Sequence, residues 1–236
     1  AGFRPELLVF DLNQLVFDNH NPASMSRKRK LEPPSEDDKL ERCGWVANQC
    51  ALYKAYHDDE WGVPVHDDVR LFEMLCLEGM QAGLSWLTVL KKRASFRERF
   101  HNFDIEKVAA MSDEDLEQCL GDASIIRHRQ KIFGVRTNAL AVLQIQREFG
   151  SLNAFIWSYV PDGKPIMNKF ADESNLPSKT ALSDRLAHDL KGRGMSFVGS
   201  TIAYAFLQAV GVVNDHTINC FVARREDQPS LGKKDE

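Results

Sequence analysis

Cysteine is scarce in this sequence, and its number is odd: five residues among 236, at irregular spacings. A small secreted protein held together by disulfides normally has an even number of cysteines, so the pattern favours a reducing compartment. No apolar run is long enough to span a membrane, so we expect a soluble protein without membrane partners. Internal repeats are absent, and alternation of apolar and polar residues is rare, which argues against a fold built from strands.

An excess of positive charge is also missing, because 30 basic residues face 34 acidic ones and the net charge is −4. An average of this kind can conceal a basic face that binds nucleic acid. Two stretches, "KKRASFRER" and "RHRQKIFGVR", could form such a face or could be ordinary solvated helix surfaces. Their basic residues are Lys91, Lys92, Arg93, Arg97 and Arg99 in the first, and Arg127, Arg129, Lys131 and Arg136 in the second.

Three regions differ in composition. Residues 1–41 include a charged, proline-containing stretch and are expected to be a largely disordered extension. Residues 42–225 form the expected domain, and residues 226–236 form a polar tail. The run Arg27, Lys28, Arg29 and Lys30 is either a nuclear-import signal or a solvated part of the extension. The expected location is therefore the cytoplasm by default, and the nucleus if the run is a signal.

The central region has the periodicity of helices. In "DDVRLFEMLCLEGMQAG" the apolar residues recur at helical spacing. Ser112 and Asp115 have the spacing of a capping box, and Gly150 and Gly194 are typical helix stops. We therefore predict a mostly α fold. The apolar positions of the first helix are Val69, Phe72, Leu75, Cys76 and Met80.

A possible metal site lies near the C-terminus in "VVNDHTINCF". His216 and Cys220 would share one face if this stretch were helical. With Cys43 and His57 they would complete a Cys2His2 set, which suits one structural zinc ion per chain. Such a site would leave no open position for a catalytic water. The competing ligands are Cys50, His66 and Cys76.

Two further segments contain candidate binding residues. Glu78 is a carboxylate within an apolar run, so it is a functional residue, an exposed helix residue or part of a structural ion pair. The segment "KGRGMSFVGST" precedes an apolar helix expected to begin near Thr201. It is compatible with a hairpin whose N–H groups meet a phosphate, or with a plain turn between helices.

From residue 42 to residue 220 the sequence resembles the DNA-3-methyladenine glycosylase I family. The matching stretches are "RCGW", "YHDDEWGVP", "LFEMLCLEGMQAGLSW", "TVLKKR", "IIRHRQKI", "FVGSTI" and "VNDH". The resemblance implies a helical domain of the helix–hairpin–helix glycosylase superfamily. It also implies a structural zinc ion bound by the Cys2His2 set named above.

The same resemblance implies roles for individual residues. Glu78 would contact the flipped base, and Tyr53, Tyr56 and Trp86 would be the stacking walls, while Trp45 and Trp61 could belong to the pocket or to the core. Leu84 would fill the gap in the duplex, with Gln81 nearby, and Gly194 and Gly199 would belong to the DNA-binding hairpin. The implied activity is hydrolytic excision of 3-methyladenine from double-stranded DNA, in base excision repair, by a monomer.

Two departures qualify this resemblance. The superfamily's usual catalytic aspartate aligns with Asn214, and the neighbouring Asp215 could equally cap a helix. "NQCALY" replaces the Asp-Pro that many members have before the tyrosine position. No lysine is placed to act as a Schiff-base nucleophile, so we expect a monofunctional hydrolase. The alternatives are a catalytically inactive, zinc-stapled protein that binds DNA damage, and a zinc hydrolase of small molecules, which would need an open coordination site.

Overall fold

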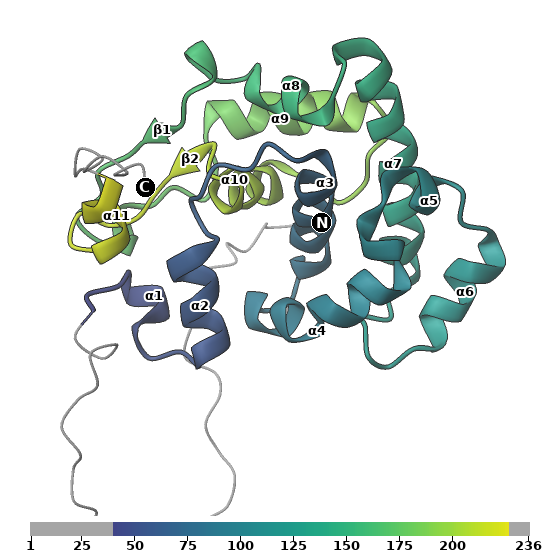
Figure 1. Cartoon of the computed structure of the whole chain (residues 1–236), viewed down its shortest axis with the longest axis horizontal. Coiled ribbons are helices and arrows are strands. Elements are labelled where there is room, and N and C mark those ends of the chain that lie inside the picture. The colour runs from purple at the N-terminus through teal and green to yellow at the C-terminus, as the bar shows by residue number, and fades with distance from the viewer. Residues whose placement is uncertain (1–39, 227–236) are drawn as a thin grey trace, which may run out of the picture. The chain divides into compact units, whose positions relative to one another are not determined.

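The computed structural model describes residues 40–226. The predicted extension, with its basic run at residues 27–30, and the predicted polar tail therefore lie almost wholly outside the described residues. Within them the fold is mostly helical, as predicted (Figure 1). No helix in the described part of the chain is long and apolar enough to cross a membrane.

Eleven α-helices follow one another along the described residues. They are α1 (Gly44–Ala47), α2 (Ala51–Asp59), α3 (Asp68–Gln81), α4 (Trp86–Arg99), α5 (Ile105–Ala109), α6 (Asp113–Gly121), α7 (Arg129–Phe149), α8 (Leu152–Trp157), α9 (Ala181–Gly192), α10 (Ser200–Ala209) and α11 (Phe221–Glu226). Short 3-10 turns cover His101–Phe103, Pro161–Gly163 and Glu173–Asn175. The strands β1 (Ile166–Met167) and β2 (Val213–Asn214) pair in parallel, with Ile166 opposite Val213.

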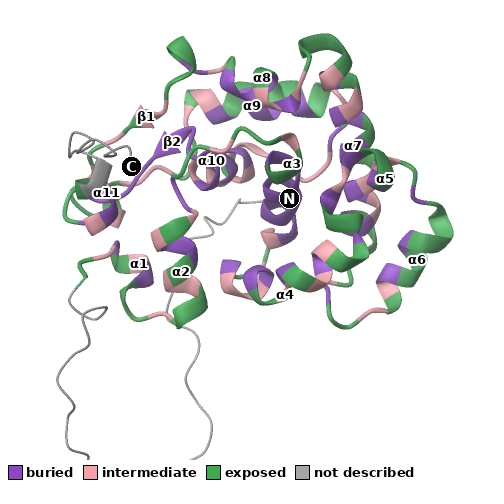
Figure 2. Cartoon of the chain, in the orientation of Figure 1, coloured by how far each residue is buried: buried purple, intermediate pink, exposed green. Residues whose placement is uncertain are grey.

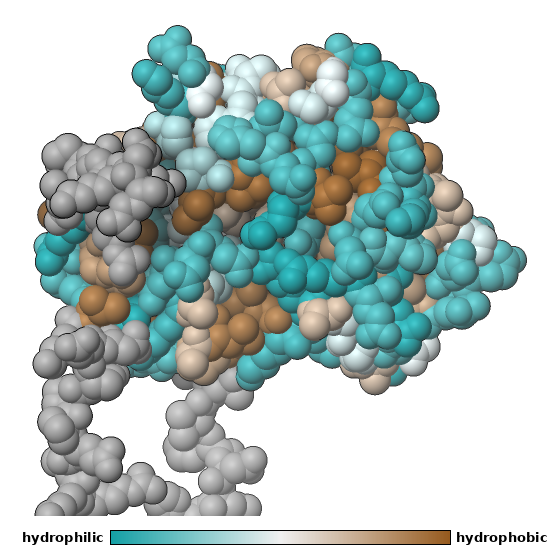
Figure 3. Space-filling model, in the orientation of Figure 1, coloured by the Kyte–Doolittle hydropathy of each residue, from teal (hydrophilic) through white to brown (hydrophobic). Residues whose placement is uncertain are grey.

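Helix α3 is the centre of the domain (Figure 2). All of its residues from Leu71 to Met80 are buried, because α4, α7, α8 and α10 pack around it. A helix that is covered on every side needs few polar positions. The prediction for this segment is confirmed except at Val69, which is 37% exposed because it lies in the first turn, before the helix enters the core. The face seen in Figure 3 is mostly hydrophilic, with hydrophobic atoms visible between the helices.

The helix ends follow the local sequence. Ser112 and Asp115 form the predicted capping box of α6. Gly150 ends α7 with φ +85°, a backbone conformation that side chains with a Cβ disfavour. The expected stop at Gly194 is two residues late, since α9 ends at Gly192 and Gly194 (φ +84°) lies in the following turn. Helix α10 begins at Ser200, one residue before the predicted start.

The segment with His216 and Cys220 is not helical, which corrects the prediction made from their spacing. It is a turn between β2 and α11. Its backbone N–H groups do not make the hydrogen bonds of an α-helix. The His216 N–H donates to the Asn214 side chain (3.1 Å), and the Ile218 N–H donates to the Phe170 carbonyl (2.9 Å). These two partners, one local and one distant in the sequence, replace the bonds to residues four earlier that a helix requires.

Candidate functional site

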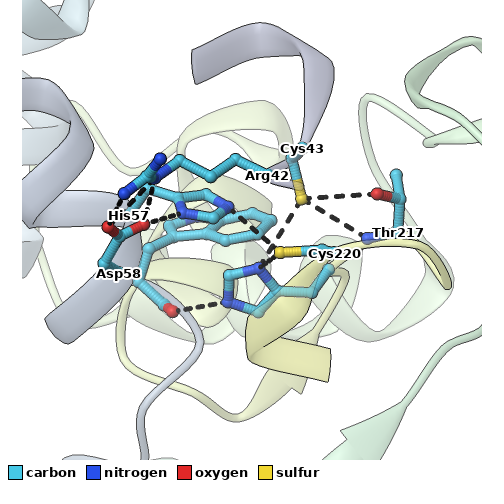
Figure 4. A network of polar contacts seen from close by, with 8 residues as sticks. Arg42, Cys43, His57, Asp58, Thr217 and Cys220 are labelled. Atoms are coloured by element: carbon cyan, nitrogen blue, oxygen red, sulfur yellow. Dashed lines mark hydrogen bonds and ion pairs between the residues drawn. The ribbon is translucent and has the colours of Figure 1, made fainter. Parts of the chain in front are cut away.

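Cys43, His57, His216 and Cys220 converge in the interior, and all four are buried. Figure 4 shows them with their polar neighbours. The Cys220 sulfur lies 3.5 Å from His57 Nε2 and 3.5 Å from His216 Nδ1, and the Cys43 sulfur lies 3.6 Å from His216 Nδ1. All four ligand atoms lie within 4.8 Å of one another. The cluster is therefore a place that could hold a metal ion.

The competing ligands lie elsewhere. Cys50 is exposed, and Cys76 is buried outside the cluster. His66 contacts the Asn153 side chain at 2.9 Å and stacks on Trp157, with ring centroids 4.5 Å apart. The structure thus brings together the four ligands that the sequence resemblance implied.

Segments that are distant in sequence supply these ligands. Cys43 directly precedes α1, His57 lies on α2, and the other two come from the turn after β2. Gly62 lets the chain pass close to them. A Cβ there would lie 3.1 Å from the His216 ring, and the φ of +82° also favours glycine.

A second layer of contacts orients the ligands. Arg42 binds the Asp58 carboxylate through two nitrogens, at 2.9 and 2.7 Å, and Asp58 lies 2.7 Å from His57 Nδ1. Burial opposes the charge of Asp58, but the hydrogen bonds from Arg42 and His57 prevail and lower its pKa. His216 Nε2 lies 3.0 Å from the Trp61 carbonyl oxygen. Each ring therefore directs its other nitrogen toward the sulfur atoms, an arrangement common around protein metal sites.

The two thiols influence each other. A hydrogen bond from Cys43 lowers the pKa of Cys220 against the effect of burial, and contacts with His216 and His57 lower it further. The same sulfur–sulfur contact, together with burial, raises the pKa of Cys43. The protein groups alone thus favour a thiolate at Cys220 and a thiol at Cys43. A bound cation would favour the thiolate form of both cysteines.

Beside this cluster lies a pocket of about 220 Å³. Tyr53 and Tyr56 come from α2, Glu78 from α3 and Trp86 from α4. The Tyr53 and Tyr56 rings are stacked with centroids 6.5 Å apart, and Tyr56 lies 5.3 Å from Trp86. The lining residues are Trp45, Tyr53, Tyr56, Trp61, Glu78, Gln81, Trp86, Leu176, Ala205 and Gln208.

Glu78 is the charged residue of this pocket. It is 3% exposed, and its Oε2 has no hydrogen-bond partner among the described residues. Burial raises the pKa of Glu78 to about 8. The alternatives of an exposed residue and of a structural ion pair are therefore wrong. Trp86 Nε1 is a second buried polar atom without a partner, so the pocket presents an unpaired acceptor and an unpaired donor.

Several pocket residues were left open or missed by the sequence analysis. Trp45 and Trp61 line the pocket and also contact His57, with ring centroids 5.1 and 6.2 Å from it. They thus join the pocket to the metal-ligand cluster. Gln208 and Leu176 had no recognisable signal, because one lies in an apolar helix and the other in an irregular segment.

Asp215 is buried and engaged. Its carboxylate accepts hydrogen bonds from the Tyr204 hydroxyl (2.5 Å), the Gln208 amide (2.7 Å) and the Asn168 amide (2.7 Å). No helix begins at Asp215, so the helix-cap alternative is wrong. With three donors bound, this carboxylate is a structural acceptor that holds Gln208 at the pocket wall.

The glycine-rich segment between α9 and α10 connects two helices that pack on each other. Gly199 is the N-cap of α10 and provides no side-chain cap, whereas Thr180 and Ser183 form a capping box at the start of α9. The first N–H groups of α10 therefore lack the side-chain acceptor that α9 has.

Gln81 and Leu84 flank the turn between α3 and α4. Gln81 is the last residue of α3 and lines the pocket, and Leu84 is half-buried. Gln81 before the turn and Trp86 after it both line the pocket, so this turn borders the pocket.

Most of the basic residues in the two stretches make ion pairs or hydrogen bonds with other groups of the domain. Arg93 and Arg97 both donate to Glu73, at 2.7 Å, and Lys131 donates to backbone carbonyls. Arg93 and Lys131 are thus buried by these contacts, whereas four residues of the two stretches are exposed: Lys91, Arg99, Arg127 and Arg129. The remaining engaged residues are Lys92 with Ala123 and Ser124, Arg99 with Asp122, Arg129 with Glu117, and Arg136 with Asp113.

Known proteins are similar to this chain in sequence and in fold over about three quarters of its length. Residues 45–223 match the methyladenine glycosylase family model. DNA-3-methyladenine glycosylase 1 of Escherichia coli (strain K12) is 53% identical over 181 residues, which cover 77% of this chain and 96% of that protein. A crystal structure of 3-methyladenine DNA glycosylase I has a TM-score of 0.74 at 52% identity and covers 77% of this chain and 98% of that one. A variant of 3-methyladenine DNA glycosylase I in complex with 3-methyladenine has a TM-score of 0.72 at 35% identity, over 74% of this chain and 94% of that one.

The helical domain thus corresponds to solved glycosylases over nearly their whole length, and the protein is a glycosylase. Within that class the chain belongs to the methyladenine glycosylase family, since the family model and the 53% identity both extend through the domain. The resemblance identified in the sequence is confirmed.

Proposed function

We propose that this protein is a monofunctional DNA glycosylase that flips an alkylated nucleotide out of duplex DNA and hydrolyses the N-glycosidic bond of 3-methyladenine. The product would be an abasic site. The observation that carries this proposal is Glu78, a buried carboxylate with an unpartnered oxygen at the wall of an aromatic pocket. A buried acceptor without a protein partner costs free energy unless a ligand satisfies it.

The charge of the substrate explains this choice of residues. 3-Methyladenine attached to deoxyribose is cationic, so a carboxylate and electron-rich rings bind it more strongly than they bind neutral adenine. The cation favours the deprotonated form of Glu78, which burial alone disfavours near neutral pH. The base then leaves as a neutral molecule, so the reaction needs little general acid. Selection of the cation is the main task of such a site.

The metal in this proposal is a structural zinc ion. At ordinary zinc–sulfur and zinc–nitrogen bond lengths, neighbouring ligands of a tetrahedral ion lie about 3.3–3.8 Å apart. The three sulfur–nitrogen distances of 3.5, 3.5 and 3.6 Å in the cluster fit this geometry. Four protein ligands fill the ion, so it would join the segment before α1 to the segment before α11 and leave no position for a reacting water.

The DNA contacts would come from two places. The open N–H groups at the start of α10, with Gly194 and Gly199 in the hairpin, suit a backbone phosphate. Leu84, in the turn between α3 and α4, would enter the space left by the flipped nucleotide, with Gln81 at the pocket edge. Both features would act on the duplex while the base occupies the pocket.

No lysine lines the pocket in the described part of the chain, which supports hydrolysis without strand cleavage. A lysine nucleophile would form a Schiff base with the sugar and could lead to cleavage of the strand. The carboxylate of Asp215 is engaged by three donors, so it is a poor candidate for the base that activates water.

The proposal is tested by incubating the protein with methylated duplex DNA and identifying the released bases by chromatography. Wild type should release 3-methyladenine, and Glu78→Gln should release it about 100-fold more slowly, because the charged acceptor is lost. Glu114→Gln, which changes an exposed acid on α6, is the matched control and should behave as wild type. Equal release by Glu78→Gln would remove Glu78 from the mechanism.

If folded wild-type protein bound the methylated duplex and released no base, the excision proposal would be wrong. The protein would then be a damage-binding protein of the same fold. Abasic product that is cut at its sugar without added alkali would contradict the monofunctional reaction. Zinc content measured on the same preparation checks the metal assignment independently.

A further inference from the structure

The hairpin after α9 and the turn after α3 are far apart in the sequence, yet both bond to one face of α7. That face consists of Lys131, Gly134 and Asn138, which are spaced three and four residues apart and so lie along one side of the helix. Helix α3 packs against both α7 and α10, and Figure 1 shows it between them. In the proposed function, neither Lys131 nor Asn138 contacts DNA or the base.

Lys131 holds the turn. Its Nζ donates to the Met80 carbonyl (2.9 Å) and to the Ala82 carbonyl (2.6 Å), and its side chain is only 6% exposed. The carbonyls at the end of a helix lack partners within the helix, so a buried ammonium group is a strong donor for them. The contact fixes the turn directly before Leu84.

Asn138 holds the hairpin. Its Nδ2 donates to the Ser196 carbonyl (3.1 Å), and its Oδ1 accepts from the Ser196 N–H (2.9 Å). A buried amide that pairs with both backbone groups of one residue fixes both the position and the orientation of that residue.

Close packing joins these two contacts. Phe197 has a φ of +56°, an unusual conformation for a residue with a large side chain. A Cβ on Gly79 would lie 3.2 Å from the Phe197 Cβ, and a Cβ on Gly134 would lie 2.5 Å from the Ser196 Oγ. The cavity between α3, α7 and Phe197 is only about 10 Å³. A displacement of the hairpin would therefore be transmitted to the end of α3.

We infer that Lys131 and Asn138 are positioning residues, which hold the phosphate-binding hairpin and the Leu84 turn at the separation that nucleotide flipping requires. This inference rests on the proposed function. Both DNA contacts must form at once on a duplex, so a small error in their spacing would slow flipping. In Asn138 variants the base pocket itself would keep its shape, because no residue that lines it bonds to Asn138. Lys131 is nearer to the pocket, since the two carbonyls that it binds flank Gln81, which lines it.

The test uses Lys131→Met and Asn138→Leu in the full-length protein. A fluorescent base analogue opposite the lesion reports flipping in a methylated duplex, and titration with free 3-methyladenine reports the pocket. We expect flipping and single-turnover excision to slow about 10–100-fold, since small misplacement of reacting groups has effects of this size. In Asn138→Leu the dissociation constant of the free base should change less than about threefold, and Lys131→Arg should recover part of the rate that Lys131→Met loses.

Gln146→Met is the matched structural control. Gln146 lies at the other end of α7 and donates to Asp68 at 2.7 Å, away from the hairpin and the turn. It should lose thermal stability and flip the nucleotide at the wild-type rate. Asn138→Asp keeps the acceptor for the Ser196 N–H and places a second oxygen opposite the Ser196 carbonyl, so it disrupts the same contact at nearly unchanged side-chain volume where Asn138→Leu does not fold.

The possible failures are distinguishable. If wild type releases 3-methyladenine while Lys131→Met and Asn138→Asp flip and excise as fast as Gln146→Met, the positioning role is overturned and the proposed function stands. Equal weakening of free-base binding and of flipping would also overturn it, since that result indicates a general structural role. Release of no base by wild type would overturn the proposed function and the positioning role together.

Discussion

Two groups of buried polar side chains lie side by side in this domain and differ in how completely their hydrogen bonds are satisfied. In the metal-ligand cluster, each histidine has an oriented partner and each sulfur faces a ring nitrogen. In the neighbouring pocket, Glu78 Oε2 and Trp86 Nε1 have no partner. Trp45 and Trp61 belong to the surroundings of both groups.

The difference separates a structural role from a binding role. Satisfied buried groups maintain the fold, because leaving any one of them unpaired costs about 1–3 kcal/mol or more. Unsatisfied groups keep that cost in the free protein and lose it when a ligand pairs with them. Changes in the cluster should therefore reduce stability, while changes in the pocket should reduce ligand binding.

The largest effect is expected in the cluster, for Cys220→Ala. Loss of a ligand should release the proposed zinc ion and lower the free energy of unfolding by about 5 kcal/mol or more. Zinc content and thermal unfolding measure the result. Cys119→Ala, which removes a buried thiol from α6, controls for the loss of side-chain volume. Zinc content equal to wild type in Cys220→Ala would contradict the ligand assignment.

Two glutamates on α3 should respond to pH in opposite ways. Glu78 has a raised pKa of about 8 in the folded protein and an ordinary pKa of about 4.5 in the unfolded chain. Between these two values the carboxyl ionises in the unfolded chain and stays protonated in the fold, so the stability of the fold falls progressively as the pH rises from about 4.5 to about 8. Glu78→Gln should thus gain stability over wild type across this range, reaching about 2–5 kcal/mol at the alkaline end.

Glu73 provides the opposite case on the same helix. Burial disfavours its charge, but hydrogen bonds from Arg97 and Arg93 prevail and lower its pKa. Its contribution to stability is present above the unfolded pKa of about 4.5 and is lost as the pH falls through the lower folded value. Glu73→Gln should therefore be less stable than wild type at neutral pH. Urea unfolding from pH 4 to 9 measures the stability of both variants relative to wild type. A change of the same sign in both variants at neutral pH would refute the comparison.

A smaller effect is expected for Asp58→Asn, which weakens the second layer of the cluster. The variant keeps all four ligands and loses the charged partner of His57, so metal affinity should fall about 10–100-fold. Competition with a chelator measures this affinity. Asp59→Asn changes the exposed neighbouring acid and should match wild type. An unchanged zinc affinity in Asp58→Asn would show that the Asp58 carboxylate is needed only as the ion-pair partner of Arg42.

The smallest effect is expected for Trp86→Phe, which removes the unpartnered pocket donor. Binding of free 3-methyladenine should weaken about tenfold, with little change in thermal stability, because no protein hydrogen bond is lost. Trp157→Phe is the matched case, since Trp157 Nε1 donates to the Val65 carbonyl at 3.0 Å. It should lose stability and bind the base normally. Loss of stability without loss of binding in Trp86→Phe would remove Trp86 from base recognition.

The sequence predicted some parts of this protein well. Apolar periodicity identified α3, and the Ser112 capping box and the stop at Gly150 depend only on local chemistry. The four metal-ligand candidates were proposed from their residue types, with three competing ligands left open, and the family resemblance implied the same four. The reason first given for pairing His216 with Cys220, a shared helical face, was wrong, because a turn brings these side chains together.

The sequence by itself determined the helical class, the helix ends and the presence of sulfur, imidazole and carboxylate groups, because these depend on residue type and local spacing. Only the tertiary structure decided which of those groups are satisfied. Glu73 and Glu78 are five residues apart on one helix and equally buried, at 3% exposed. Arginines from α4 reach Glu73, and none reaches Glu78. That difference arises from how α4 packs on α3, since a residue's partners come from segments that its own local sequence does not specify.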